Sequence, residues 1–367
     1  MSQIRPYKQV LNFLNEIIEQ SAYAPDLKLP SERMLATKFD ASRRSIRLAY
    51  DKLIEENIVV KVHGKGYFTT GKKEKRDKNS PLSVKKIYFI VPALKTVFAQ
   101  NILNGITDFC DEHTMDVSIK LSKSSLEKES QYVNSAYLAD AKGIILFPID
   151  NELVNTELLK LASNRYPVAV IDRYFKNVNS SFISTDNFNA MIEAVKFLKS
   201  KKHENLLYLT SPTSLATTVG ERLNGFLTGF EKYYGKKGND SVITIQDFSY
   251  EQIFNGVTSY VKNNPKTEVI ICPGVRAVTD AIISALNSIK LSIPKDIKLM
   301  VFDNDFSYTE VNLVKPYVIE QDSYQIGYSS AAALYNQIYG DLRTVSIRLP
   351  VKIVDYSKKR LNKKRPL

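Results

Sequence analysis

Hydrophobic positions follow a regular alternation through most of this chain. From about residue 85, short apolar runs alternate with stretches whose apolar residues recur at helical spacing. Such runs are typical of strands buried on both faces, so the alternation predicts parallel sheets covered by helices. We expect strands at 87–91, 115–119, 143–147, 168–171, 182–183, 206–209, 269–271 and 299–302. Helical stretches lie near 98–112, 151–163, 187–201, 249–263 and 276–289.

Residues 29–70 have a different pattern, which predicts two short helices and a hairpin. Pro30 disfavours helix in the residue before it, so Ser31 is expected to cap a first helix. The residues expected to bury one face of this helix are Met34, Leu35 and Phe39. Ser42 then caps a second helix through residue 55, and strands at 58–62 and 67–70 enclose a glycine-containing turn. Two helices joined by a short turn form a helix-turn-helix.

The start of the second helix carries cationic and hydroxyl side chains, namely Arg43, Arg44, Ser45 and Arg47. This end of such a helix enters the major groove of DNA, where an arginine can donate two hydrogen bonds to guanine. A lone arginine-rich helix start is more often a solvated face. The hairpin beside it strengthens the DNA interpretation, because Gly64 and Gly66 allow a tip carrying Lys65 to approach DNA closely.

Residues 5–70 resemble the winged-helix DNA-binding domain of the GntR family of bacterial transcription regulators. The resemblance rests on the segments 29–33, 42–49 and 64–68, with Ser45 where the family usually has threonine. It implies DNA contacts by Arg33, Arg43, Arg47 and the wing tip at 64–66. We expect Glu32 to orient Arg33 rather than to contact DNA.

Charge and composition agree with a DNA-binding module on a separate body. Residues 1–86 hold 18 lysines and arginines against 10 acidic residues, within a total formal charge of +12. A basic module favours nucleic acid. Cys110 and Cys272 are too isolated for a disulfide framework or a metal site, and no signal peptide or long apolar run is present, so a cytoplasmic location is expected. The charged segment 71–84 reads as a linker, and the basic cluster at 358–367 as a solvated tail.

Polar residues follow several of the predicted strands, as expected at the ligand-binding edge of parallel sheets. Asp172 and Arg173 follow the strand at 168–171, and Asp303 follows the strand at 299–302. Residues 85–357 resemble the effector-binding domain of the LacI family, which shares its fold with periplasmic sugar-binding proteins. The segments that carry this resemblance are 168–173, 184–187, 221–226, 293–296 with 301–304, and 349–354.

The LacI resemblance implies that Arg222 and Asp303 bind the effector. A guanidinium and a carboxylate suit neighbouring sugar hydroxyls, which both donate and accept hydrogen bonds. The alternative is a salt bridge that only braces the lobes. Asp172 and Arg173 could brace the strand end or contact ligand. Asp186 and Asn187 are expected to cap the next helix, with a role in the cleft as the alternative. The aromatic and cationic side chains that could also line the effector site are Phe98, Phe147, Tyr174 and Lys95.

Two departures from the LacI pattern concern the effector site. Pro273-Gly274 replaces the usual Asn-Asp pair, and the Thr-Thr of the late crossover is absent, although Gln321 remains. These changes affect the expected identity of the effector more than the fold.

The sequence therefore predicts an α/β chain with a small winged helix-turn-helix domain (1–70) and a two-lobed periplasmic-binding-protein-like domain with parallel sheets (85–357). The combination resembles regulators of the arabinose-repressor type. We expect a homodimer that reads a palindromic operator in double-stranded DNA, represses carbohydrate-utilisation genes and binds a monosaccharide such as arabinose or fucose. A sugar phosphate held by Lys95, Arg222 and Arg276, or another small metabolite, is the alternative effector, and an enzyme acting on the bound ligand is the alternative from another class. No cofactor or catalytic residue is expected, because no nucleophile and base occur in a recognisable arrangement.

Overall fold

The chain divides into an N-terminal unit at residues 1–83 and a body at residues 84–367. The computed structural model describes residues 6–21, 24–55, 58–62, 64–71, 84–149, 155–173, 175, 178, 180–212, 216–303, 305–340 and 343–357. The predicted linker, apart from Gly71 and Val84, and the basic tail lie outside these ranges. Among the helices of the described ranges, none is long and apolar enough to cross a bilayer.

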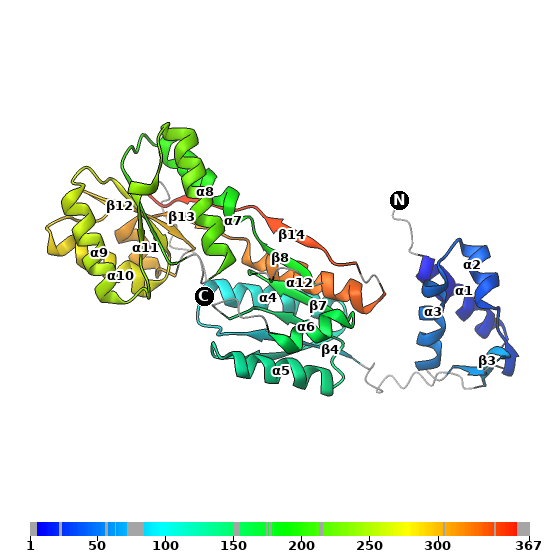
Figure 1. Ribbon diagram of the computed structural model, residues 1–367. Coiled ribbons are helices and arrows are strands. Elements are labelled where there is room, and N and C mark those ends of the chain that lie inside the picture. Colours follow the sequence, from blue (N-terminus) through cyan, green and yellow to red (C-terminus); the bar gives the residue numbers. More distant parts are fainter. Residues whose placement is uncertain are drawn as a thin grey trace. The chain divides into compact units, whose positions relative to one another are not determined.

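The described part of the N-terminal unit contains three helices and a three-stranded antiparallel sheet of order β1-β3-β2. Its elements are α1 (Pro6–Gln20), β1 (Pro25–Lys28), α2 (Glu32–Phe39), α3 (Arg43–Glu55), β2 (Val59–Val62) and β3 (Gly66–Thr70). Their shared core includes Leu14, Leu35, Ile46, Leu53 and Tyr67. The hairpin β2–β3 follows α3 in the chain and packs on the same core through Val59 and Tyr67. Helices followed by such a hairpin are the arrangement of a winged helix (Figure 1).

Local sequence explains where the two predicted helices begin. The Ser31 hydroxyl accepts a hydrogen bond from the Met34 amide at 3.3 Å, and the Ser42 hydroxyl accepts one from Ser45 at 3.1 Å. Both caps agree with the sequence-based expectation. The expectation that Met34 is buried is wrong, because 50% of this residue is exposed. Leu35, one position later, faces the core instead. The sequence pattern predicted no element over α1 or β1.

The body consists of two lobes, each built on a six-stranded sheet (Figure 1). Lobe 1 has the strand order β14-β8-β7-β6-β4-β5, and all its neighbouring strands are parallel. Its elements are β4 (Lys85–Val91), α4 (Val97–Glu112), β5 (Met115–Leu121), α5 (Leu126–Leu138), β6 (Gly143–Leu146), α6 (Thr156–Ser163), β7 (Val168–Ile171), β8 (Ser181–Thr185), α12 (Ser323–Ile338) and β14 (Ser346–Leu349).

Lobe 2 has the order β10-β9-β11-β12-β13-β15, in which only the described pairing of β13 with β15 is antiparallel. Its elements are α7 (Asn187–Ser200), β9 (Leu206–Thr210), α8 (Thr217–Tyr234), a 3-10 turn (Asn239–Ser241), β10 (Val242–Thr244), α9 (Tyr250–Asn263), β11 (Val269–Pro273), α10 (Arg276–Ser288), β12 (Lys298–Phe302), α11 (Tyr308–Val314), β13 (Tyr317–Glu320) and β15 (Lys352–Asp355). Each predicted strand has a counterpart here or in lobe 1.

Within the described residues, the chain passes between the lobes three times, after β8, after β13 and after β14. Two hydrogen bonds connect these crossovers. The Asp186 amide donates to the Leu349 carbonyl at 2.8 Å, and the Thr185 hydroxyl donates to Gln321 Oε1 at 2.6 Å. Away from the crossovers, the Val97 amide of lobe 1 donates to Asp305 Oδ1 of lobe 2 at 3.3 Å. The carboxyl ends of several strands of both sheets therefore lie beside the crossovers.

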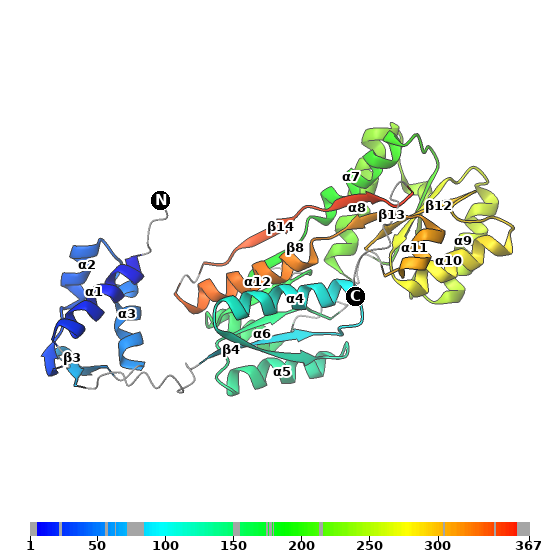
Figure 2. The same ribbon diagram turned by 180° about the vertical axis from the view of Figure 1, so that it is seen from behind.

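Helices α4 and α12 lie side by side on one face of the lobe 1 sheet in both ribbon views (Figure 2). Glycines allow this close approach. A Cβ atom at Gly105 would lie 2.1 Å from the Tyr324 carbonyl oxygen, and one at Gly327 would lie 2.0 Å from the Ile102 carbonyl oxygen. Real side chains do not come this close, so both positions require glycine for the observed packing.

Candidate functional site

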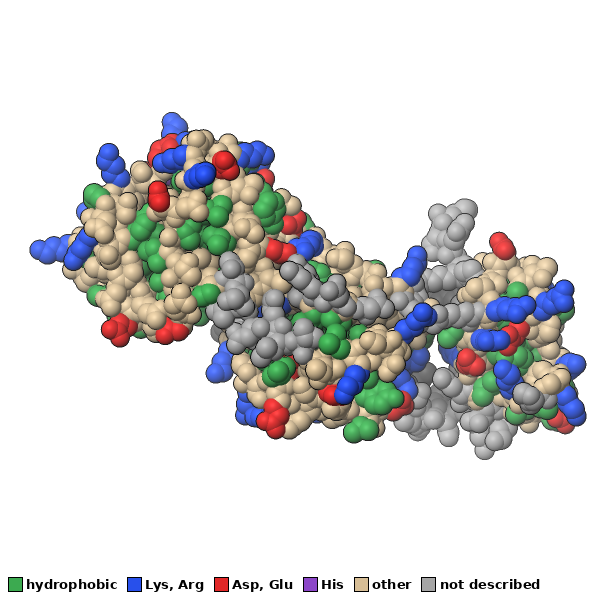
Figure 3. Space-filling view, in the orientation of Figure 1, with side chains coloured by type: hydrophobic (Ala, Val, Ile, Leu, Met, Phe, Trp, Pro, Cys, Tyr) green, Lys and Arg blue, Asp and Glu red, His purple; other side chains and the backbone are tan. Residues whose placement is uncertain are grey.

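The predicted DNA-binding side chains lie around the N-terminal end of α3 and on the wing. Arg43 and Arg47 of α3 are exposed, as is Arg33 of α2, while Ser45 is half-buried and contacts the Ser42 hydroxyl at 2.9 Å. The Arg44 side chain lies outside what the structure describes. The space-filling view shows several lysine and arginine side chains on the visible face of this unit (Figure 3). These groups could donate to base edges or phosphates.

The tip of the wing has the backbone conformation that its glycines predicted. Gly64 and Gly66 have φ angles of 73° and 112°, a region that favours glycine, and the Lys65 amide donates to the Val62 carbonyl at 3.1 Å. Lys65 and Gly64 are exposed. The tip therefore presents a cation with little side-chain bulk around it.

Glu32 contacts Arg47 rather than Arg33, so the expected role of this glutamate is wrong. Glu32 Oε2 accepts a hydrogen bond from Arg47 Nε at 2.9 Å, and Oε1 accepts one from the Tyr67 hydroxyl at 2.7 Å. Burial alone would raise the pKa of Glu32, but these hydrogen bonds and the Arg47 charge outweigh it and lower the pKa. Local spacing could not predict this contact, because 15 residues separate the partners.

In the body, two aspartates occupy matching corners of the two lobes. Asp172 follows β7 and Asp303 follows β12, with φ angles of 65° and 64°. Each backbone amide donates at 3.0 Å to a strand carbonyl, that of Ile183 for Asp172 and that of Ile319 for Asp303. Aspartate tolerates this left-handed conformation better than most residues. Each lobe thus carries a carboxylate where a parallel strand ends.

Arg222 of α8 is held between an amide and an aromatic ring. Its Nε donates to Asn187 Oδ1 at 2.7 Å, and its guanidinium lies 3.6 Å from the centre of the Phe302 ring. Asn187 is fully buried and donates in turn to the Thr185 carbonyl at 3.1 Å. The expected capping role of Asn187 is therefore wrong, whereas Asp186 does cap α7, accepting from the Asn189 amide at 3.2 Å.

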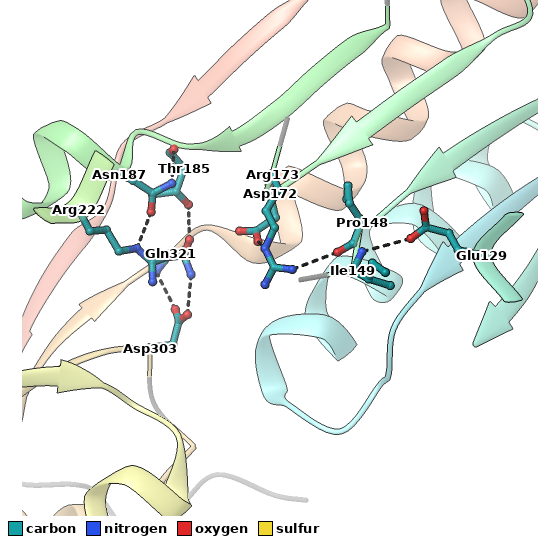
Figure 4. A network of polar contacts seen from close by, with 10 residues as sticks. All are labelled: Glu129, Pro148, Ile149, Asp172, Arg173, Thr185, Asn187, Arg222, Asp303 and Gln321. Carbon is teal, nitrogen blue, oxygen red and sulfur yellow. Dashed lines mark hydrogen bonds and ion pairs between the residues drawn. The ribbon is translucent and has the colours of Figure 1, made fainter. Parts of the chain in front are cut away.

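Asp303 is held by Gln321, which follows β13. Gln321 Nε2 donates to Asp303 Oδ2 at 2.5 Å, and the Gln321 amide donates to Oδ1 at 3.4 Å (Figure 4). Burial raises the pKa of Asp303 to about 6, against the opposing effects of the Arg222 charge and the Gln321 hydrogen bonds. The Asp172 charge adds to the increase. Through Gln321 and Thr185, one network connects Asp303 with Asn187 and Arg222.

Asp172 and Arg173 brace the loop at Pro148 and Ile149. They form an ion pair with 3.6 Å between Asp172 Oδ2 and Arg173 Nε, and Arg173 Nη1 donates to the Pro148 carbonyl at 3.1 Å. The next amide, of Ile149, donates to the buried Glu129 at 3.2 Å. Phe147 lies near the Arg173 guanidinium, at 5.7 Å, and packs edge-on against Phe98 with 6.2 Å between the ring centres.

Two other residues named for the effector site, Lys95 and Arg276, have no described contact with this network. Lys95 is exposed, and Tyr174 lies outside the described residues. Arg276 forms an exposed ion pair with Glu310. The sequence pattern indicates no role for Thr185, Phe302 or Glu129, because each contacts the site through a residue distant in the chain.

The loop after β11 packs so closely against β12 that Gly274 leaves no room for a side chain. The Gly274 amide donates to the Phe302 carbonyl at 2.8 Å, and a Cβ atom here would lie 2.1 Å from the Asp303 carbonyl oxygen. Glycine therefore allows the loop after β11 to pack directly against the Asp303 corner. Neither Pro273 nor Gly274 supplies the polar side chain that the family pattern places after this strand.

A winged helix with exposed arginines, joined to a two-lobed body with polar strand ends, indicates a DNA-binding transcription regulator. Residues 87–342 match the family of the periplasmic binding protein domain, and residues 6–69 match the bacterial regulatory proteins of the gntR family. The chain belongs to the periplasmic binding protein domain family and has a GntR-family DNA-binding domain at its N-terminal side.

Known proteins with similar sequence or fold include regulators. The arabinose metabolism transcriptional repressor of Halalkalibacterium halodurans is 23% identical over 224 residues, which are 60% of this chain and 59% of that protein. The trehalose repressor from Escherichia coli has 17% identity and a TM-score of 0.61, covering 74% of this chain and all of that structure. A periplasmic binding protein/LacI transcriptional regulator from Alkaliphilus metalliredigens, complexed with D-xylulofuranose, has 20% identity and a TM-score of 0.59, covering 74% and 97%.

Proposed function

We propose that this protein is a repressor of carbohydrate-utilisation genes that is controlled by a free monosaccharide. The observation that carries the proposal is the network joining Arg222, Asn187, Thr185, Gln321 and Asp303 at the crossovers. It places a guanidinium and a carboxylate together, each held by a group on a crossover. A sugar hydroxyl pair can accept from the former and donate to the latter.

The charges near the network favour an uncharged ligand. Two carboxylates, Asp172 and Asp303, accompany two guanidinium groups, Arg173 and Arg222, so the charges compensate one another. A phosphate would be favoured by excess positive charge. Two further cations could supply this charge, but Arg276 is paired with Glu310, and Lys95 has no described contact with the network. A pentose or a deoxyhexose, such as arabinose or fucose, remains our preferred ligand.

On the DNA side, we infer that Arg33, Arg43, Arg44, Ser45 and Arg47 contact the operator together with the wing tip at Gly64, Lys65 and Gly66. A homodimer would place two such units on the half-sites of a palindrome. Sugar binding between the lobes would change operator affinity through its different affinity for the two lobe arrangements. The arabinose-repressor relative is consistent with this role, and no turnover of the sugar is expected.

Thermal unfolding of the full-length protein against a panel of pentoses, hexoses and their phosphates tests the ligand class. A binding sugar should raise the unfolding temperature, because it binds the folded state only. We expect a free monosaccharide to do so, and Arg222→Ala to abolish the shift. Arg276→Ala is the matched control and should retain it. A shift by phosphates alone that requires Arg276 would replace the free-sugar proposal with the phosphate alternative.

A further inference from the structure

We propose that Glu32 is a positioning residue for operator recognition, which fixes the Arg47 guanidinium relative to both the recognition helix and the wing. The proposal rests on the DNA contact that the preceding section assigns to Arg47. It goes further, because it holds that a carboxylate with no DNA contact of its own influences which base Arg47 prefers. The observation behind it is that one side chain of α2 accepts hydrogen bonds from α3 and from β3 at the same time.

The geometry leaves the useful part of Arg47 available. Glu32 Oε2 is bonded to Nε of Arg47, and Nε is the inner nitrogen of the guanidinium group. The two terminal nitrogens are those that form a fork toward guanine O6 and N7. About 60% of the Arg47 side chain is exposed, against 20% for Glu32, so the arginine end extends outward from a less exposed carboxylate. An arginine oriented before binding loses less conformational freedom when it meets a base.

The second oxygen of Glu32 connects this arginine to the wing. Tyr67, which donates to it, is buried in β3 directly after Gly66 of the wing tip. The Tyr67 ring stacks on Tyr50 of α3 with 3.7 Å between centres and 3° between planes. The Tyr50 hydroxyl donates to the Pro30 carbonyl, just before α2. A closed set of contacts therefore fixes α2, α3 and β3 around the Glu32 carboxylate.

Charge gives Glu32 an effect on selectivity that a purely structural contact would lack. A carboxylate beside Arg47 cancels part of the attraction that this arginine exerts on any DNA backbone, which is the term common to all sequences. The same carboxylate leaves intact the directional hydrogen bonds that Arg47 can donate to a base. Glu32 should thus lower non-specific binding while increasing the preference for the operator.

The test uses the full-length protein and an operator selected from a random duplex library by the unaltered protein. Affinity for this operator and for an unrelated duplex is measured at several salt concentrations, with base preference determined at each position. Arg47→Ala should lower operator affinity roughly 10-fold to 100-fold and relax preference at one position of each half-site. Glu32→Gln should relax the same position, reduce operator affinity several-fold and leave non-specific affinity equal or higher.

Three further variants make the result specific. Glu32→Gln combined with Arg47→Ala should be no less selective than Arg47→Ala alone, because Glu32 acts through Arg47. Tyr67→Phe keeps the ring stack but removes one donor to Glu32, and should reduce selectivity less. Glu19→Gln removes the same charge from an exposed position on α1 and should leave base preference unchanged.

The outcomes separate this inference from the proposed DNA contact. Unchanged operator affinity in Arg47→Ala would remove the contact itself and the inference with it. If Arg47→Ala weakens binding but Glu32→Gln matches Glu19→Gln in affinity and base preference, the contact stands and the positioning role is overturned. A Glu32→Gln protein that binds the operator more tightly, with unchanged preference, would also overturn it, since Glu32 would then restrain Arg47 rather than present it.

Discussion

The residues of the candidate site are held by partners far away in the chain, and these partners determine their orientation and, for Asp303, the pKa. Arg222 and Asn187 are 35 positions apart, and Thr185 and Gln321 are 136 apart. The strand-end position of Asp303 could be predicted from the apolar run before it. Its raised pKa and its contact with Gln321 could not, because they depend on how β12 and β13 pair in lobe 2.

The raised pKa of Asp303 predicts a stability change in Asp303→Asn. A carboxyl whose pKa is raised by folding costs no folding free energy at pH values below its ordinary pKa. The cost grows as the pH rises through the folded-state value of about 6 and is then fully present. Asparagine removes this cost and tolerates the left-handed backbone, so the ligand-free variant should be more stable near neutral pH by up to about 3 kcal/mol.

Chemical denaturation of the sugar-free protein at about pH 5 and about pH 7.5 measures this effect. The gain from Asp303→Asn should be larger at the higher pH. Asp280→Asn, at an exposed position of α10, is the control and should show little gain at either pH. The same variant should lose sugar binding, because an amide no longer provides a charged acceptor. An equal gain at both pH values would show that ionisation of Asp303 does not limit stability.

At the scale of elements, prediction from sequence succeeds where burial is nearly complete. The strands β4, β6, β7 and β12 are apolar runs covered on both faces, and their sequences show it without knowledge of the fold. Helices with mixed faces, such as α5, α8 and α12, were not predicted, and neither was the short buried strand β13. Their apolar positions make sense only against particular neighbours, as the close packing of α12 on α4 illustrates.

The helix pair α4 and α12 gives a prediction at this scale. Gly327→Ala places a methyl group about 2.0 Å from the Ile102 carbonyl oxygen, so the two helices must separate. The expected loss is at least about 1–3 kcal/mol of unfolding free energy for the body, as in other overpacked interfaces. Gly256→Ala on α9 is the control, because its methyl group meets side-chain methyl groups, that of Ile245 Cδ1 at 3.3 Å and that of Ile243 Cγ2 at 3.8 Å. Helix propensity should make that change neutral or stabilising.

Thermal unfolding followed by circular dichroism compares the two alanine variants. Gly327→Ala should unfold at a lower temperature than the unaltered protein, and Gly256→Ala should not. Equal behaviour would mean that the α4–α12 contact adjusts without cost. The comparison matters for signalling, since α12 begins directly after the crossover that carries Gln321.

For the molecule as a whole, the proposed regulation requires that a sugar bound at the strand ends changes the relation between the two lobes. The contacts that could transmit this change lie at the crossovers, where Thr185 touches both branches of the network. Its carbonyl accepts from Asn187 beside Arg222, and its hydroxyl donates to Gln321 beside Asp303. Both proposed ligand-binding groups are thus connected to the same residue at the end of β8. Allosteric coupling is a free energy between sites, so it can be changed without removing either site.

Thr185→Val should therefore weaken signalling more than it weakens sugar binding. Valine keeps the shape of the buried side chain but removes the donor to Gln321, while the backbone carbonyl still accepts from Asn187. We expect the ratio of operator affinities without and with the identified sugar to fall roughly five-fold, or about 1 kcal/mol of coupling, with a smaller change in sugar Kd. Fluorescence anisotropy of labelled operator and calorimetry with the sugar measure the two quantities. Thr279→Val is the matched control, since its buried hydroxyl donates at 2.9 Å to the Arg276 carbonyl of α10 and has no described contact with the network. An unchanged affinity ratio in Thr185→Val, with sugar binding intact, would place the transmission of the signal outside the Thr185–Gln321 contact.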